Sequence, residues 1–169
     1  MGAGQGITRP KDGMKIRILT ITQKVPVWIK AGCDEYTKRL PASCSLEIIE
    51  ISAKKRLQNS DIKRITKEEG EKMLSLIAPQ DYVVALDVKG KAWSTEQLAS
   101  ELRTWQSLGQ NVNLLIGGAD GLAEACLQRA NSRWSLSALT FPHILVRLIL
   151  AEQIYRAWSI TQNHPYHRG

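Results

Sequence analysis

The densest group of residues suited to ligand binding is the segment Leu115–Leu122, which reads LIGGADGL. An apolar, strand-like run leads straight into Gly117, Gly118 and Gly121. Glycine lets the backbone approach a ligand closely and adopt a positive φ, and open α/β sheets bind ligands at the carboxyl ends of their strands. The spacing is G-G-x-x-G after the fourth predicted strand, which disfavours the dinucleotide fingerprint G-x-G-x-x-G. The segment indicates a ligand-binding loop; a tight strand-to-helix turn without a ligand is the alternative.

Two other strand ends can converge on the same place. Leu86 and Asp87 end the third predicted strand, and Leu136–Phe141 (LSALTF) leads into the last helix. The second stretch offers backbone amides, two hydroxyls and apolar walls but no charge. Such a surface suits a flat heterocycle with an apolar, thioether-like arm better than a phosphate. Taken singly, each segment is also explained as a core strand.

The C-terminal run Asn163–Gly169 (NHPYHRG) holds two of the three histidines, His164 and His167. A metal site is disfavoured, because the scattered cysteines provide no obvious further ligands. Acid/base chemistry or contact with RNA is plausible for histidine here. A solvated tail is the alternative.

The last predicted helix, over residues 143–160, is apolar nearly all round. Such a helix is normally buried on more than one side, and in a chain this small the simplest second partner is another copy. Glu152 and Arg156 are four residues apart, so they can pair on one face. A structural pair and an active-site role are equally compatible with that spacing.

A basic stretch lies between residues 54 and 72. Most of it fits a solvated helix face, but Lys54, Lys55 and Arg56 form a run without acidic neighbours in the sequence. Such a run can contact phosphates, which supply affinity without sequence specificity.

Alternating strands and helices must position these residues. Strands are predicted over residues 15–22, 46–51, 81–88, 111–116 and 134–140, and helices over 26–40, 60–77, 94–108, 122–130 and 143–160. Asp61 lies near one helix start, where the helix dipole favours an acidic residue. Ser94 is the expected N-cap of the next helix. This alternation indicates one α/β domain with a mostly parallel sheet.

The composition narrows the class of protein. The 169 residues carry 23 Lys and Arg against 16 Asp and Glu, a formal charge of +7. That excess suits a polyanionic partner, with nucleic acid favoured over a membrane surface. Three widely spaced cysteines indicate reduced thiols in a cytosol, and no apolar run is long enough to span a membrane. Residues 1–13, rich in glycine, are expected to be a disordered leader or an expression remnant.

Four segments resemble the RlmH family of bacterial SPOUT methyltransferases. They read LDVKGKAW (86–93), NLLIGGADGL (113–122), WSLSALTFPH (134–143) and YRAWSITQNHPYHR (155–168). The resemblance covers essentially all of residues 14–169. It implies a Rossmann-like α/β domain with a C-terminal deep trefoil knot, working as a homodimer in the cytoplasm. The implied reaction is methylation, dependent on S-adenosylmethionine, of N3 of a pseudouridine in helix 69 of 23S rRNA within the assembled ribosome.

The resemblance also implies site residues. The cofactor contacts would be Leu86, Gly117, Leu136, Ser137, Ala138, Leu139, Thr140 and Phe141. The candidates for orientation and proton transfer are His167, Tyr166 and Arg168, supported by Glu152 and Arg156. No metal, DNA or membrane is implied. Many members have Pro-Glu where this chain has Ala119-Asp120, which is expected to leave that loop less rigid.

Other functions stay open at this point. A SPOUT methylase of another RNA site, a ribose 2′-oxygen or a tRNA base, is possible because folds do not determine substrates. A non-catalytic ribosome-binding protein would keep the basic surface without binding S-adenosylmethionine. A nucleotide-binding oxidoreductase is disfavoured by the glycine spacing.

Overall fold

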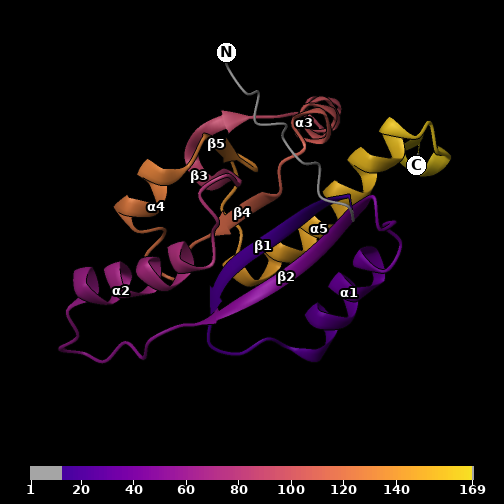
Figure 1. Ribbon diagram of the computed structural model, residues 1–169. Coiled ribbons are helices and arrows are strands. Elements are labelled where there is room, and N and C mark those ends of the chain that lie inside the picture. The colour runs from indigo at the N-terminus through magenta and orange to yellow at the C-terminus, as the bar shows by residue number, and fades with distance from the viewer. Residues whose placement is uncertain (1–12, 169) are drawn as a thin grey trace, which may run out of the picture.

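The computed structural model describes residues 13–168. Its centre is a five-stranded parallel sheet in the order β2-β1-β4-β3-β5 (Figure 1). The strands are β1 (Met14–Thr22), β2 (Cys44–Ser52), β3 (Tyr82–Ala92), β4 (Val112–Ile116) and β5 (Ser132–Ser135). The predicted α/β class with a parallel sheet is confirmed.

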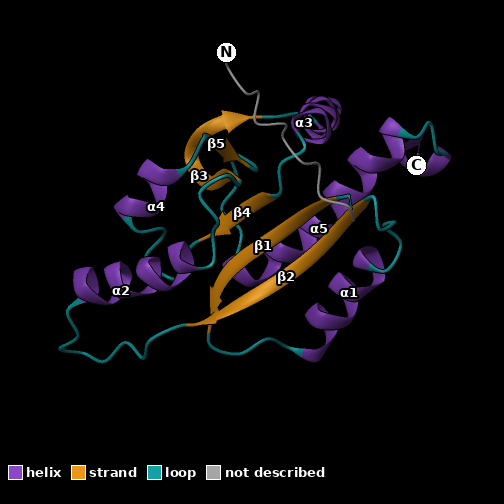
Figure 2. Ribbon diagram, in the orientation of Figure 1, coloured by secondary structure: helices purple, strands orange, loops and turns teal. Residues whose placement is uncertain are grey.

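Helices cover both faces of the sheet (Figure 2). The helices α1 (Val27–Thr37), α3 (Thr95–Leu108) and α5 (His143–Thr161) pack on one face, with α5 between the other two. The helices α2 (Ile62–Ser75) and α4 (Glu124–Arg129) pack on the other. Because both faces of the sheet are buried, side chains on opposite faces of one strand pack into two different hydrophobic cores. Ile16 and Ile18 of β1 belong to the first core, and Leu19 and Ile21 to the second.

The helix starts agree with the local sequence. The Asp61 side chain accepts a hydrogen bond from the Arg64 backbone N–H at 3.2 Å. Ser94 and Gln97 form a reciprocal capping box at the start of α3. These caps satisfy amide groups that have no partner inside the helix, so the predicted N-cap role of Ser94 is confirmed.

The fifth predicted strand is only partly correct. β5 ends at Ser135, and residues 136–140 leave the sheet as a loop. Within that loop the Ser137 hydroxyl accepts a hydrogen bond from the Leu139 backbone N–H at 3.0 Å. Such a local turn competes with strand pairing, which the alternation of apolar and polar residues did not indicate.

The remaining boundaries differ from prediction by a few residues. The predicted helix over 122–130 is shortened to α4, and the predicted helix over 26–40 ends at Thr37. Of the predicted leader, residues 1–12 lie outside the described residues. No helix within residues 13–168 is long and apolar enough to cross a membrane.

Candidate functional site

A cavity of about 220 Å³ opens at the carboxyl edge of the sheet, where β4 and β5 end and β3 leaves its pairing with β5. Its walls come from three segments: residues 86–88 of β3, the glycine loop after β4 and the loop after β5. The start of α5 closes it with His143 and Val146. The carboxyl ends of parallel strands are the usual ligand edge of such sheets.

The glycine loop is shaped by close backbone contacts. A Cβ on Gly117 would lie 2.4 Å from the carbonyl carbon of Gly121, so the two glycines can approach only without side chains. Gly121 has φ +79° and donates its N–H to the Gly118 carbonyl at 3.1 Å. The loop therefore presents bare backbone to the cavity, as expected for a ligand loop.

The other two walls leave their strands in different ways. β3 loses its register with β5 between Leu86 and Lys91, so the residues between them bulge from the sheet. Asp87 in this bulge lies 3.8 Å from Arg133. The loop after β5 adds apolar side chains, of which Leu139 is 70% exposed at the mouth.

The structure brings most of the predicted cofactor residues to this cavity. Seven of the eight line it, namely Leu86, Gly117, Leu136, Ser137, Leu139, Thr140 and Phe141. Ala138 does not line it. The cavity is also lined by His143, Trp134, Ser135 and Val146. These were not among the predicted contacts, although each lies within or next to a segment selected from the sequence.

The C-terminal tail forms a short 3₁₀ helix, η1 (Pro165–Arg168), that packs against the end of α5. The Tyr166 ring meets Tyr155 edge-on, with ring centroids 4.6 Å apart. The Tyr166 hydroxyl donates a hydrogen bond to Glu152 at 3.2 Å, and the Arg156 guanidinium lies 5.0 Å from the Tyr166 ring centroid. The tail is therefore anchored by packing, unlike the solvated tail of the alternative interpretation.

The predicted pair of Glu152 and Arg156 is confirmed, with Arg156 Nε donating to Glu152 at 2.8 Å. Burial, hydrogen bonding with Tyr36 and the charge of Glu152 raise the pKa of Tyr166 to about 12. Tyr166 is therefore a hydrogen-bond donor at neutral pH. The half-buried His167 has a ring nitrogen, Nδ1, with no hydrogen-bond partner within residues 13–168, and Arg168 is exposed.

The structure does not bring the tail and the cavity of one chain together. The cavity contacts the first residues of α5, whereas η1 follows its last residues (Figure 1). A helix of 19 residues is about 28 Å long. The predicted tail residues Tyr166, His167 and Arg168 therefore lie at the opposite end of α5 from the predicted cofactor residues, with Glu152 near the middle of the helix.

The prediction of an uncompensated Lys54-Lys55-Arg56 run is wrong. Lys54 pairs with Glu68, and Arg56 pairs with Glu69 at 2.7 Å and with Asp120 at 2.6 Å. Their partners are distant in sequence, so the local run of charge did not reveal them. Nearby, the exposed side chains of Lys55, Lys63 and Lys67 form no ion pair with an acidic residue in the part of the chain described.

Metal chemistry has no evident ligand set here. Within residues 13–168, no group of three or more His, Cys, Asp and Glu side chains is placed to hold a metal ion. The three cysteines are free and buried. Burial raises the pKa of Cys44 to about 12 and that of Cys126 to about 11, so neither is an activated thiolate.

Comparison with known proteins identifies the class. The family described as "Predicted SPOUT methyltransferase" matches residues 14–167, and the chain belongs to this family. Two solved methylase family proteins share the fold: one from Haemophilus influenzae Rd KW20 (TM-score 0.57, 10% identity, 89% of this chain and 69% of that one) and one from Neisseria gonorrhoeae (TM-score 0.50, 13% identity, 86% and 84%).

Closer relatives carry a more specific name. A protein of Hahella chejuensis called Ribosomal RNA large subunit methyltransferase H is 50% identical over 155 residues, covering 92% of this chain and 99% of the relative. The protein of that name from Ectopseudomonas mendocina is 49% identical, covering 92% of this chain and all of the relative. Membership of the SPOUT family implies the C-terminal trefoil knot and the use of S-adenosylmethionine.

Proposed function

We propose that this protein methylates N3 of a pseudouridine in helix 69 of 23S rRNA on the assembled ribosome, with S-adenosylmethionine as methyl donor. The observation that carries the cofactor assignment is the meeting of seven predicted contacts around one cavity. The target rests on the relatives, which are about half identical over their whole length and are named as large-subunit rRNA methyltransferases. The activity is assigned to a single domain over residues 14–169, in the cytoplasm.

The residues around the cavity fit the cofactor. Apolar side chains such as Leu122, Leu136 and Phe141 suit an adenine ring and a thioether arm. Gly117 and Gly118 line the cavity without side chains, so their backbone groups are available for hydrogen bonding to a ligand. Asp87 supplies a carboxylate at the rim for a polar group of the ligand.

The tail residues are assigned to orientation and proton removal. When bound, S-adenosylmethionine supplies an electrophilic methyl group, so no covalent nucleophile is required of the protein. His167 accepts the N3 proton through a ring nitrogen, and Tyr166 donates a hydrogen bond that orients the site. Arg168 holds the uracil oxygens or a neighbouring phosphate, and Glu152 with Arg156 supports Tyr166.

We infer that one active site needs two chains. The tail lies about 28 Å along α5 from the cavity of its own chain, so a second copy must supply one of the two parts. Residues 144–161 are all buried or half-buried, while Val27 and Trp28 on neighbouring α1 are 84% and 60% exposed. An exposed apolar patch of this kind fits a homodimer interface.

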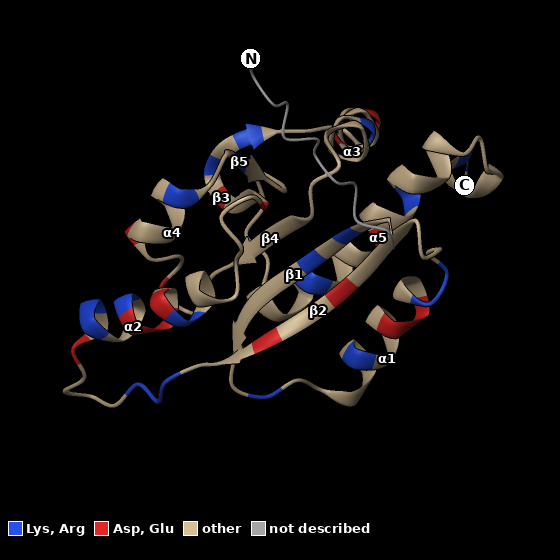
Figure 3. Cartoon of the chain, in the orientation of Figure 1, with Lys and Arg blue, Asp and Glu red and all other residues tan. Residues whose placement is uncertain are grey.

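The basic surface supports ribosomal RNA as the partner. Lysines and arginines lie along α2 and the segment before it (Figure 3). Lys55, Lys63 and Lys67 are exposed there. Phosphate contacts of this kind supply docking affinity. The largely uncharged loops around the cavity are left to provide selectivity.

The decisive test is mass mapping of 23S rRNA from a strain that lacks the gene. The helix 69 fragment is expected to lose one methyl group and to regain it with the wild-type gene. An unchanged fragment would reject the target.

The two-chain site has its own test. His167→Ala and Gly117→Ala chains are co-expressed, so that a mixed dimer combines an intact cavity with the partner's intact tail. The mixture should recover about a quarter of the wild-type activity, since half of the dimers are mixed and each has one complete site. Activity no higher than that of either variant alone would show that each site lies within one chain.

A further inference from the structure

A three-residue charge network connects α2 to the glycine loop. Arg56 lies in the segment between β2 and α2. Its Nη1 and Nη2 atoms donate to the two Glu69 carboxylate oxygens, at 3.2 and 2.7 Å. Its Nε donates to the Asp120 carboxylate at 2.6 Å, and Nη1 also donates to the Lys54 carbonyl at 3.2 Å.

The inner half of the network is built into the core. Glu69 is 1% exposed and also accepts the Lys54 backbone N–H at 3.1 Å. A buried carboxylate is stable only when it is paired and hydrogen-bonded, so Glu69 holds the Arg56 fork in one orientation. The two carboxylates also raise the pKa of Arg56 further above its ordinary value.

The outer half of the network ends on the cavity wall. Asp120 lies between Gly118 and Gly121, and both of these glycines line the cavity. A loop with three glycines has many backbone conformations available to it. The Arg56–Asp120 pair restrains the loop from outside the cavity.

We propose that Arg56 is a positioning residue for cofactor binding, which holds the Gly117–Gly121 loop in its binding shape by bridging Glu69 to Asp120. The role rests on the proposed function, because the ligand concerned is S-adenosylmethionine. Arg56 acts through Asp120 and does not itself touch the reacting atoms. Its guanidinium is engaged by carboxylates and is therefore assigned to the loop instead of to RNA phosphate.

Calorimetric titration with S-adenosylmethionine tests this role. Arg56→Lys should weaken binding about tenfold, because one ammonium does not reproduce the fork that bridges two carboxylates. Asp120→Asn should weaken it about fivefold through the loss of charge. Asp120→Glu restores the carboxylate and should bind within about twofold of wild type.

Arg64→Lys is the matched control. Arg64 lies on the exposed face of α2, 3.7 Å from Glu68, and has no contact with the loop. The same chemical change there should leave affinity as in wild type. A similar loss in Arg64→Lys would show that the effect is not specific to the Arg56 bridge and overturn the proposal.

Hydrogen exchange gives a readout that does not need the ligand. Amides of residues 117–122 should exchange about tenfold faster in Arg56→Lys and in Asp120→Asn, while the β1 amides keep wild-type protection. Since Asp120 is at the surface, Asp120→Asn tests the loop even if Arg56→Lys folds poorly.

The outcomes separate this inference from the proposed function. If wild type does not bind S-adenosylmethionine, the proposed function fails, while loop exchange still reports on Arg56. If wild type binds and both variants bind and exchange as it does, the positioning role is wrong and the proposed function stands.

Discussion

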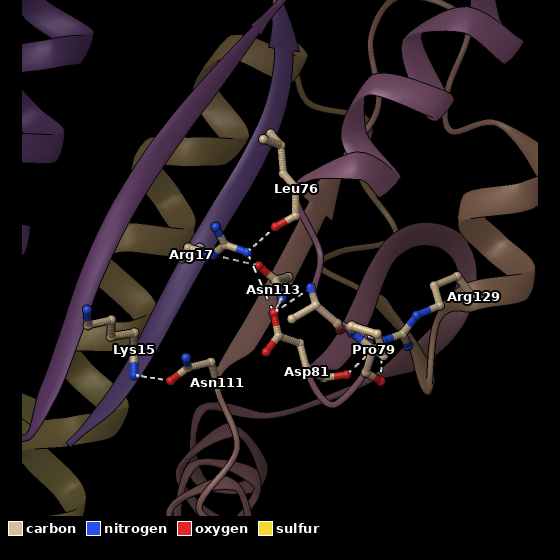
Figure 4. A network of polar contacts seen from close by, with 9 residues as sticks. Lys15, Arg17, Leu76, Pro79, Asp81, Asn111, Asn113 and Arg129 are labelled. Carbon is tan, nitrogen blue, oxygen red and sulfur yellow. Dashed lines mark hydrogen bonds and ion pairs between the residues drawn. The ribbon is translucent and has the colours of Figure 1, made fainter. Parts of the chain in front are cut away.

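The two edges of the sheet carry similar arginine–carboxylate clusters with different consequences. At the amino edge, Arg17 of β1 donates to Asn113 at 2.9 Å and lies 3.6 Å from Asp81 (Figure 4). Asn113 in turn donates to Asp81 at 3.0 Å. At the carboxyl edge, Arg56 bridges Glu69 and Asp120.

The amino-edge cluster joins parts of the fold to one another. Asp81 also accepts the Ala78 backbone N–H at 3.1 Å, and Arg129 at the end of α4 donates to the Asp81 carbonyl at 2.9 Å. Asn113 is fully buried. The polar groups are used within the fold, and the cluster stabilises the start of β3 and β4.

The carboxyl-edge cluster has one buried end and one end on a loop. Glu69 is as buried as Asn113, but Asp120 belongs to a glycine loop beside a cavity. Burial of an ion pair therefore does not itself separate a structural role from a functional one. The two clusters differ in the element that holds the outer partner of the arginine, which at the carboxyl edge is a loop beside the cavity. The following changes test that distinction.

The largest effect is expected at the loop itself. Gly117→Ala places a methyl group 2.4 Å from the Gly121 carbonyl carbon, so the loop must change shape. Binding of S-adenosylmethionine should weaken by about 100-fold or more, measured by calorimetry. Gly118→Ala should weaken binding less, because the nearest atoms to its Cβ would be side-chain atoms, Ile21 Cγ2 at 3.3 Å, Ile21 Cβ at 3.6 Å and Arg56 Nη2 at 3.9 Å.

Breaking the amino-edge cluster should lower the stability of the fold more than the affinity for S-adenosylmethionine. Asp81→Ala leaves the Asn113 amide and the Arg17 guanidinium short of a partner, so the free energy of unfolding should fall by about 2 kcal/mol. Denaturant unfolding measures the loss. An equal loss of affinity in the folded variant would contradict the division of roles between the two edges.

The tail should affect the rate more than cofactor affinity. Tyr166→Phe keeps the ring packed on Tyr155 but removes the hydroxyl that donates to Glu152. Single-turnover methylation of ribosomes should slow by about tenfold, with affinity for S-adenosylmethionine unchanged. Tyr82→Phe, which alters a core tyrosine beside Trp105, is the control and should keep the wild-type rate.

The smallest effect expected is the pH response of the same tyrosine. Because the pKa of Tyr166 is raised to about 12, its hydroxyl stays protonated where a free tyrosine ionises, near about pH 10. Its contribution to stability is complete below about pH 10 and is lost as the pH rises through about 12. Phenolate absorbance of wild type minus Tyr166→Phe should show this step near 12, and a step near 10 would show that the hydroxyl is solvated.

Much of the fold was predictable because its signals are local. Capping at Ser94 depends on residues three apart, and buried strands such as β4 are continuous apolar runs. The cofactor segments could be selected because glycines and small polar residues follow strands whose carboxyl ends share one edge. Residues 136–140 were misassigned since a serine turn has nearly the same composition as a strand end.

Contacts between distant parts of the chain could not be predicted from the periodicity of the sequence. Arg56 and Asp120 are separated by 64 positions, and Arg17 and Asn113 by 96, so no periodicity connects them. The apparent surplus of charge at Lys54 and Arg56 disappears only when α2 and the glycine loop fold against them.

The sequence by itself determined the class of fold, the edge of the sheet where the cavity lies and most of the segments that line it. These follow from the local periodicity of apolar residues and from the positions of the glycines. Only the tertiary structure decided which charges are paired and that the tail and the cavity lie at opposite ends of α5. Helix length and direction set that separation, and they take effect only after α5 has packed across the sheet from its carboxyl edge to its amino edge.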